Sequence, residues 1–140
     1  MTDITVTAAQ IAVLYPTKAD VRSYIAAEAI TKGNAVYFTT AGKAGIADAN
    51  AAGKQQFRGI ALNTAPAGGA VDVIHKGEVA GFAVSGINAD ALVYLSDNVG
   101  KIADGVGTMT VPVGRVVVLT NGPTATKVLL VAVSWTAQWS

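Results

Sequence analysis

From residue 35 onward, apolar and polar positions alternate along short stretches that Gly-rich turns separate. Alternation with a period of two is typical of half-buried β-strands, and Gly, Asn, Asp and Pro in the gaps are typical of tight turns. The pattern predicts an all-β fold, a compact β-barrel or β-sandwich of short antiparallel strands. The expected strands are residues 35–39, 44–47, 57–63, 70–75, 77–84, 91–96, 101–103, 110–120 and 126–134.

Two stretches of the chain repeat each other. Residues 29–48 read AITKGNAVYFTTAGKAGIAD, and residues 86–104 read GINADALVYLSDNVGKIAD. Val36-Tyr37 recurs as Val93-Tyr94, an offset of 57 (93 − 36), and both stretches end on Ile-Ala-Asp. A looser correspondence follows, in which residues 59–62 and 71–73 match residues 114–117 and 128–130. The sequence therefore predicts a β fold with an internal pseudo-repeat.

Residues 1–20 lie outside this repeat. Ile4 and Val6 alternate with polar residues, which predicts a short strand, and Tyr15-Pro16 interrupts the apolar stretch that follows. We therefore expect residues 1–20 to form an extended N-terminal arm outside the core, and residues 21–140 to form a single β domain.

Residues 17–28 fit two secondary structures. A helix capped by a threonine would place Val21, Tyr24 and Ile25 at helical spacing. A strand would place Val21, Ser23 and Ile25 on one face. The β-branched residues and the tyrosine favour the strand.

The composition indicates a covered surface. Hydrophobic residues make up 51% of the chain and charged residues only 14%, well below the usual quarter. Much of the apolar share is Ala and Val, so we expect another subunit or a partner to cover part of the surface. The alternative is a monomer with an Ala-rich surface.

Charge and cysteine content disfavour several classes of function. The net charge is +1 with no basic run, so the chain lacks the electrostatic pattern of a nucleic-acid-binding protein. Cysteine is absent, which excludes disulfides, thiolate metal sites and thiol nucleophiles. The first residues do not resemble a signal peptide, and no apolar stretch is long enough to span a bilayer. We expect a soluble protein with no membrane or nucleic-acid partner.

Catalytic chemistry has few candidate residues. His75 is the only histidine, and it precedes Lys76-Gly77 at an expected turn between two strands. A catalytic triad or a histidine metal site needs partners that this sequence hardly offers, so we interpret His75 as a polar residue beside a turn. No serine has the context of a nucleophile elbow. The sequence predicts a protein that is not an enzyme and has no cofactor or metal.

Two tryptophans, Trp135 and Trp139, lie four residues apart near the C-terminus. Large aromatic side chains at a chain end often seal a core or dock on a neighbouring subunit. Stacking on a sugar is a third interpretation, and it makes a carbohydrate- or ligand-binding β module the alternative function.

An ordered set of glycines and apolar residues runs through about residues 20–133. It reads Ala29-Ile30-x-x-Gly33-x-x-Val36-Tyr37, then Gly42-Lys43, then Gly59-Ile60-Ala61, then Gly69-x-Val71-x-Val73-x-x-x-Gly77-x-Val79. In this set the chain resembles the capsid cement proteins of tailed bacteriophages, the small proteins that decorate the phage head.

The resemblance implies a structural virion protein. Such proteins assemble, usually as homotrimers, on the outer capsid surface and clamp neighbouring copies of the major capsid protein, after synthesis in the host cytoplasm. An N-terminal extension commonly reaches the shell or a neighbour, and residues 1–20 fit that role by position. The family has no catalytic residues. We therefore expect capsid or subunit contacts at Ile4, Val6, Ile11, Val13, Leu14, Tyr15, Trp135 and Trp139.

Overall fold

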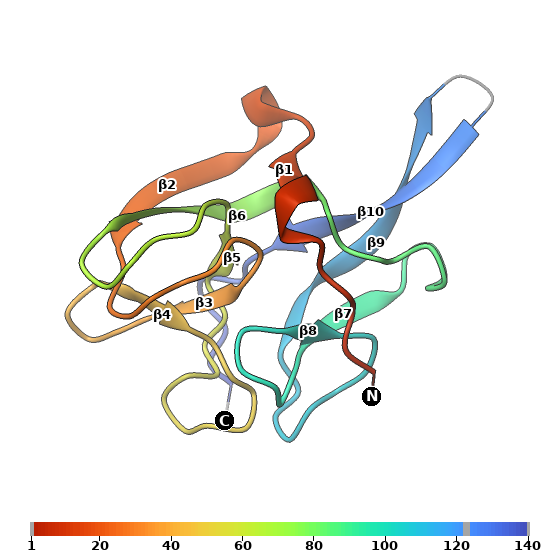
Figure 1. Ribbon diagram of the computed structural model, residues 1–140. Helices are drawn as coiled ribbons and strands as arrows, with labels where there is room; N and C mark the ends of the chain where they lie inside the picture. Colours follow the sequence, from red (N-terminus) through yellow and green to blue (C-terminus); the bar gives the residue numbers. More distant parts are fainter. Residues whose placement is uncertain (1, 122–123, 140) are drawn as a thin grey trace.

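The computed structural model describes residues 2–121 and 124–139 and is all-β (Figure 1). The strands form one antiparallel sheet of ten strands in the order β4-β3-β5-β6-β10-β9-β7-β8, with β1 and β2 paired to β6. The sheet is curled, so the predicted fold class is confirmed. The described helical elements are two 3-10 turns, η1 (Ala8–Gln10) and η2 (Pro16–Lys18), and no described helix is long enough to cross a membrane. The strands are β1 (Ala12–Val13), β2 (Asp20–Ile25), β3 (Ala35–Phe38), β4 (Ala44–Ile46), β5 (Gly59–Ala61), β6 (Ala70–Ala80), β7 (Leu92–Leu95), β8 (Ile102–Ala103), β9 (Pro112–Asn121) and β10 (Thr124–Ala132).

The pseudo-repeat of the sequence appears in the strand pairing. In the first half, β3 pairs with β4 and β5, and β5 pairs with β6. In the second half, β7 pairs with β8 and β9, and β9 pairs with β10. The sheet therefore reads as the same meander from either end, and the halves meet where β6 pairs with β10.

Two glycines hold equivalent positions in the halves. Gly59 opens β5 at φ +150°, and Gly114 lies in β9. A Cβ on Gly59 would overlap the carbonyl oxygen of Ile74 on β6, and a Cβ on Gly114 would overlap that of Leu130 on β10. The repeated glycine is therefore explained by close approach of the third strand of each meander to the fourth.

Strand β6 joins the halves because it has partners along both edges. One edge pairs with β2 and then β1, and the other pairs with β5 and then β10. The expected break between residues 70–75 and 77–84 was wrong, because Gly77 adopts φ +144° and continues the strand. The residues of β6 with a partner on each side are Val73 (Arg22 and Ala61), Ile74 (Val21 and Ile60), Lys76 (Asp20 and Ala132) and Val79 (Val13 and Leu129).

The core consists of small and β-branched side chains in two clusters. The larger cluster spans both halves and centres on Phe57, Ile60 and Leu129. The smaller cluster lies within the first half, where Ile30 and Val36 pack on Val71 and other small residues. A bridge between Ala26 and Ala44 brings the end of β2 against β4, so the first half curls back on itself.

An extended arm outside the core was expected for residues 1–20, but the described part of this segment contains two 3-10 turns and contributes side chains to the core. Ile4 is 5% exposed and Ile11 is 3% exposed, and both belong to the larger core cluster. Isolated bridges join Asp3 to Ala103 and Val6 to Phe82. The segment is held because β6 and β8 would otherwise present unpaired backbone groups and an apolar surface at this edge. The strand expected for residues 17–28 is present as β2.

Replacing Ile11 with alanine should lower the free energy of unfolding by about 3 kcal/mol, because the substitution leaves a cavity in the core. Gln10→Ala, at the exposed neighbouring position, is the control and should change it by less than about 0.5 kcal/mol. Urea unfolding followed by circular dichroism measures both. Equal stability of the two variants would show that the N-terminal segment is not part of the folded core.

Candidate functional site: an aromatic cluster on the first half

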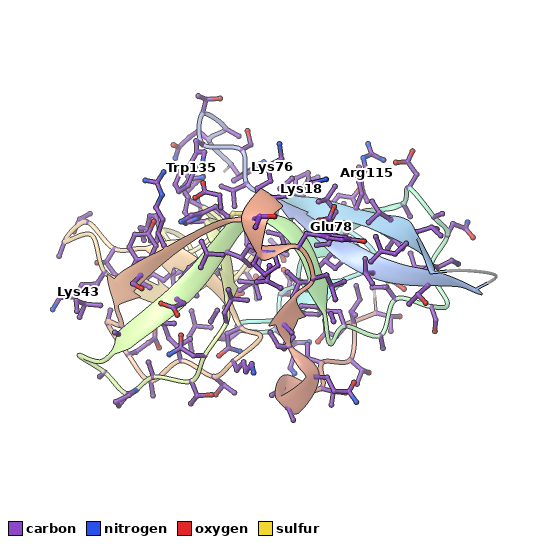
Figure 2. The ribbon with its side chains drawn as sticks, turned by 90° about the horizontal axis from the view of Figure 1, so that it is seen from above. Lys18, Lys43, Lys76, Glu78, Arg115 and Trp135 are labelled. Carbon is purple, nitrogen blue, oxygen red and sulfur yellow. The ribbon has the colours of Figure 1, made fainter. Side chains whose placement is uncertain are left out.

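One exposed tryptophan lies on a group of aromatic side chains that gather beside the junction of the halves. We call Tyr24, Phe38, Arg58, His75 and Trp135 the aromatic cluster. They come from β2, β3, the residue before β5, β6 and the segment after β10. Figure 2 shows Trp135 on the same side of the molecule as Lys76. Segments far apart in sequence therefore build one surface feature.

A β-bulge positions His75. Val21 and Asp20 are adjacent on β2, but they pair with Ile74 and Lys76 on β6, which leaves His75 as the extra residue. The His75 side chain is 1% exposed. The interpretation of His75 as a polar residue beside a turn was therefore wrong: it lies within a continuous strand, at the point where β6 passes from β5 to β10.

Both nitrogens of the His75 ring have hydrogen-bond partners. Nδ1 lies 2.5 Å from the backbone carbonyl oxygen of Arg58, and Nε2 lies 2.7 Å from the hydroxyl of Tyr24. A carbonyl only accepts, so Nδ1 carries the proton and donates it. Nε2 of the neutral ring then accepts from the Tyr24 hydroxyl. The arrangement therefore suits a neutral imidazole with one defined tautomer.

Burial sets the ionisation of this pair. Desolvation lowers the pKa of His75 below 6.5, and the positive charge of Arg22 lowers this pKa further. The hydrogen bond to the Arg58 carbonyl and the negative charge of Asp20 raise it, but desolvation is the larger effect. Desolvation also raises the pKa of the Tyr24 hydroxyl. Both side chains are therefore neutral near pH 7.

Trp135 lies over the buried ring and is 50% exposed. Its ring centroid is 4.7 Å from that of His75 and 6.1 Å from that of Phe38, and it stacks on Phe38 with an interplanar angle of 28°. The guanidinium carbon of Arg58 lies 5.7 Å from the Trp135 centroid, within the range of a cation–π contact. Arg58 also donates to the Ser134 carbonyl at 3.2 Å. These contacts hold an exposed indole in a fixed orientation.

The surroundings of the aromatic cluster can be described by hydrogen bonding, possible metal ligands and depressions. Both His75 nitrogens are occupied, and no carboxylate is hydrogen bonded to either. The described residues contain no group of three or more His, Cys, Asp or Glu placed to hold a metal ion. Two surface depressions measure about 170 and 180 Å³, below the ~300 Å³ at which ligand pockets begin.

The structure separates the residues predicted to make capsid or subunit contacts. Ile4 and Ile11, predicted as capsid or subunit contacts, are buried in the core of the chain itself. Tyr15 and Trp135 are exposed, and Tyr15 lines the smaller depression. Tyr15 is not a member of the aromatic cluster that contains Trp135. The remaining predicted residues, Val6, Val13, Leu14 and Trp139, are half-buried, and all but Leu14 pack against the larger core cluster.

Sequence reasoning found Trp135 but missed the residues beneath it. One signal was present, because His75 follows Val71 and Val73 with a period of two and so shares the phase of their buried face. No sequence signal pairs Tyr24 with His75, which are 51 residues apart. Curling of the first half brings them together.

Comparison with protein-family models gives no match, and comparisons with curated proteins and with solved structures give none either.

Lowering the pH below 6.5 should destabilise the protein through His75. The unfolded chain binds a proton near pH 6.5, whereas the folded chain binds it only at the lower pKa, so the free energy of unfolding falls between these values. The slope cannot exceed about 1.4 kcal/mol per pH unit. Urea unfolding at about pH 7.5 and about pH 5.5 measures it.

His75→Gln should remove this part of the pH dependence while the carboxylates continue to titrate. If the free energies of unfolding of wild type and His75→Gln differ by the same amount at both pH values, His75 is not held neutral by the fold.

Proposed function

We propose that this chain is a structural virion protein that decorates the outer surface of a phage head and cements neighbouring major capsid proteins. The observation that carries the contact mechanism is the Trp135 ring, half exposed and fixed on Phe38, His75 and Arg58. The resemblance of the sequence to phage cement proteins supplies the partner. The head is therefore the proposed place of action.

The aromatic cluster suits contact with a protein surface. Trp, Tyr and Arg are the residues most enriched among those that dominate binding energy at interfaces. Trp135 is already held by its neighbours, so little side-chain freedom would be lost when a partner covers it. A shell partner would need an apolar recess for the indole and an acceptor for Arg58.

The low charge of the chain also fits a cementing role. With charged residues at 14%, contact with a shell or with another copy desolvates few ionic groups. Many identical contacts on one lattice hold through multivalency, so each can be weak. The resemblance further implies a homotrimer, and the function requires neither a cofactor nor an enzymatic step.

Trp135→Ala should weaken attachment to undecorated heads by about tenfold or more, as expected for an interface anchor. Val99→Ala removes an exposed apolar side chain from the turn between β7 and β8 and is the matched control. Co-sedimentation of each purified variant with heads measures attachment. Equal attachment of Trp135→Ala and Val99→Ala would show that the aromatic cluster is not part of the interface with the head.

A carbohydrate-binding module is the second candidate, because an exposed tryptophan ring can also stack on a sugar face. Titration of a Trp139→Phe variant, in which fluorescence comes from Trp135 alone, separates the two. We expect no saturable change with soluble glycans, and a saturable change would favour this second function.

A further inference from the structure

The larger of the two surface depressions, about 180 Å³, lies where three parts of the chain meet. Its lining residues come from the turn of residues 31–34 before β3, from Gly100 and Lys101 before β8, and from Val6 and Ala8 of the N-terminal segment. Both halves of the pseudo-repeat therefore contribute to this depression, whereas no member of the aromatic cluster does.

Two glycines allow these parts of the chain to approach closely. A Cβ on Gly100 would lie 2.7 Å from Asn34 Nδ2, and a Cβ on Gly33, which adopts φ +95°, would lie 2.7 Å from Cγ1 of Val6. Both distances are well below the optimum of about 3.5–4.0 Å for contacts between carbon atoms. Gly33 and Gly100 therefore let Asn34 and Val6 take their places at the depression.

A hydrogen bond orients the Asn34 side chain. Its Oδ1 accepts from the Thr31 N–H at 2.8 Å. A backbone N–H only donates, so the amide oxygen faces Thr31 and Nδ2 faces away from it, toward Gly100. Nδ2 donates to no described residue, and the one buried side-chain atom without a partner in the described chain is Gln55 Oε1, so solvent reaches Nδ2. The depression thus contains an oriented donor with no acceptor.

The charged residues that line this depression are all positive. Lys32 and Lys101 belong to the lining, which includes no carboxylate. Neither lysine forms an ion pair with a described residue. The other depression differs, because Glu78 lines it together with Lys18 and Lys76. Only the depression at Asn34 therefore combines two cations with no negative charge of its own.

We propose that this depression binds a small, doubly charged oxyanion such as inorganic phosphate. Lys32 and Lys101 supply two positive charges, and Asn34 Nδ2 and the Thr31 hydroxyl supply hydrogen-bond donors. A volume of about 180 Å³ accommodates one group of this size but is too small for a nucleotide.

The charge of the lining selects a dianion over a carboxylate. A singly charged carboxylate balances one of the two lysines, whereas a dianion balances both. The donors also select an anion over a metal ion, because ammonium and amide N–H groups offer no lone pair. Binding needs no head, so this inference goes beyond the proposed function.

Titration of the isotope-labelled full chain with sodium phosphate, at about pH 7.5 and constant ionic strength, tests the site by NMR. We expect saturable shifts of the Asn34 side-chain NH₂ resonances, with a dissociation constant in the millimolar range that suits so small a ligand. Shifts that rise without saturation would overturn the proposal. Sodium acetate is the comparison ligand, and acetate binding as tight as phosphate binding would overturn the selection of a dianion.

Lys32→Gln and Lys101→Gln should each weaken phosphate binding about fivefold, as expected for the loss of one charge about 4 Å from the anion in water. Lys43→Gln is the matched control, because Gly42-Lys43 holds in the first half the place of Gly100-Lys101 in the second. Lys43 is exposed, lines neither of the two depressions, and lies at the edge of the molecule in Figure 2. Equal weakening by Lys43→Gln and Lys101→Gln would show that only net charge matters and would overturn the site.

Asn34→Asp tests the oriented donor while keeping the shape of the side chain. The carboxylate still accepts from the Thr31 N–H, but it replaces the Nδ2 donor with a negative charge. Phosphate binding should fall at least about tenfold, with the NMR spectrum showing that the chain stays folded. Unchanged affinity in the folded variant would contradict the proposal. If Asn34→Asp does not fold, the comparison of Lys101→Gln with Lys43→Gln decides.

Discussion

The pairing of β6 along both of its edges is the constraint on which the rest of the structure depends. The first part of β6 pairs with β5 and completes the meander of β3, β4 and β5. The second part pairs with β10, the last strand of the second meander. The bulge at His75 lies at the changeover, where one extra residue shifts the strand from one set of partners to the next. A polar residue buried at this point is tolerated because Tyr24 and the Arg58 carbonyl satisfy both ring nitrogens.

That changeover also explains where the exposed aromatic surface lies. The His75 ring turns toward β2 and β3, so Tyr24 and Phe38 pack on its sides and Trp135 lies over it. The segment after β10 reaches this place because Val133 N donates to the His75 carbonyl at 2.9 Å. The junction of the halves therefore fixes the orientation of an aromatic side chain that solvent can reach.

Much of the fold was predictable from the sequence, because strand alternation and the recurrence of Val36-Tyr37 as Val93-Tyr94 are local signals. The paired meanders, and β2 as a strand, followed from them. The continuity of β6 was missed because Gly77 has the sequence signature of a turn, and its positive φ instead extends a distorted strand. The position of residues 2–14 was missed for a different reason: Ile4 and Ile11 are buried by tertiary contacts with strands far along the chain. The aromatic cluster was missed for the same reason, since its members come into contact only when the first half curls.

The shared strand has a consequence for how the protein unfolds. Duplicated domains joined by a linker can melt one after the other, whereas here the last strand of one unit is the first strand of the next. Unfolding of either unit would remove hydrogen-bond partners from β6 and expose the larger core cluster, which spans both units. The two units should thus behave as one cooperative block, with amide protection along β6 matching that of global opening.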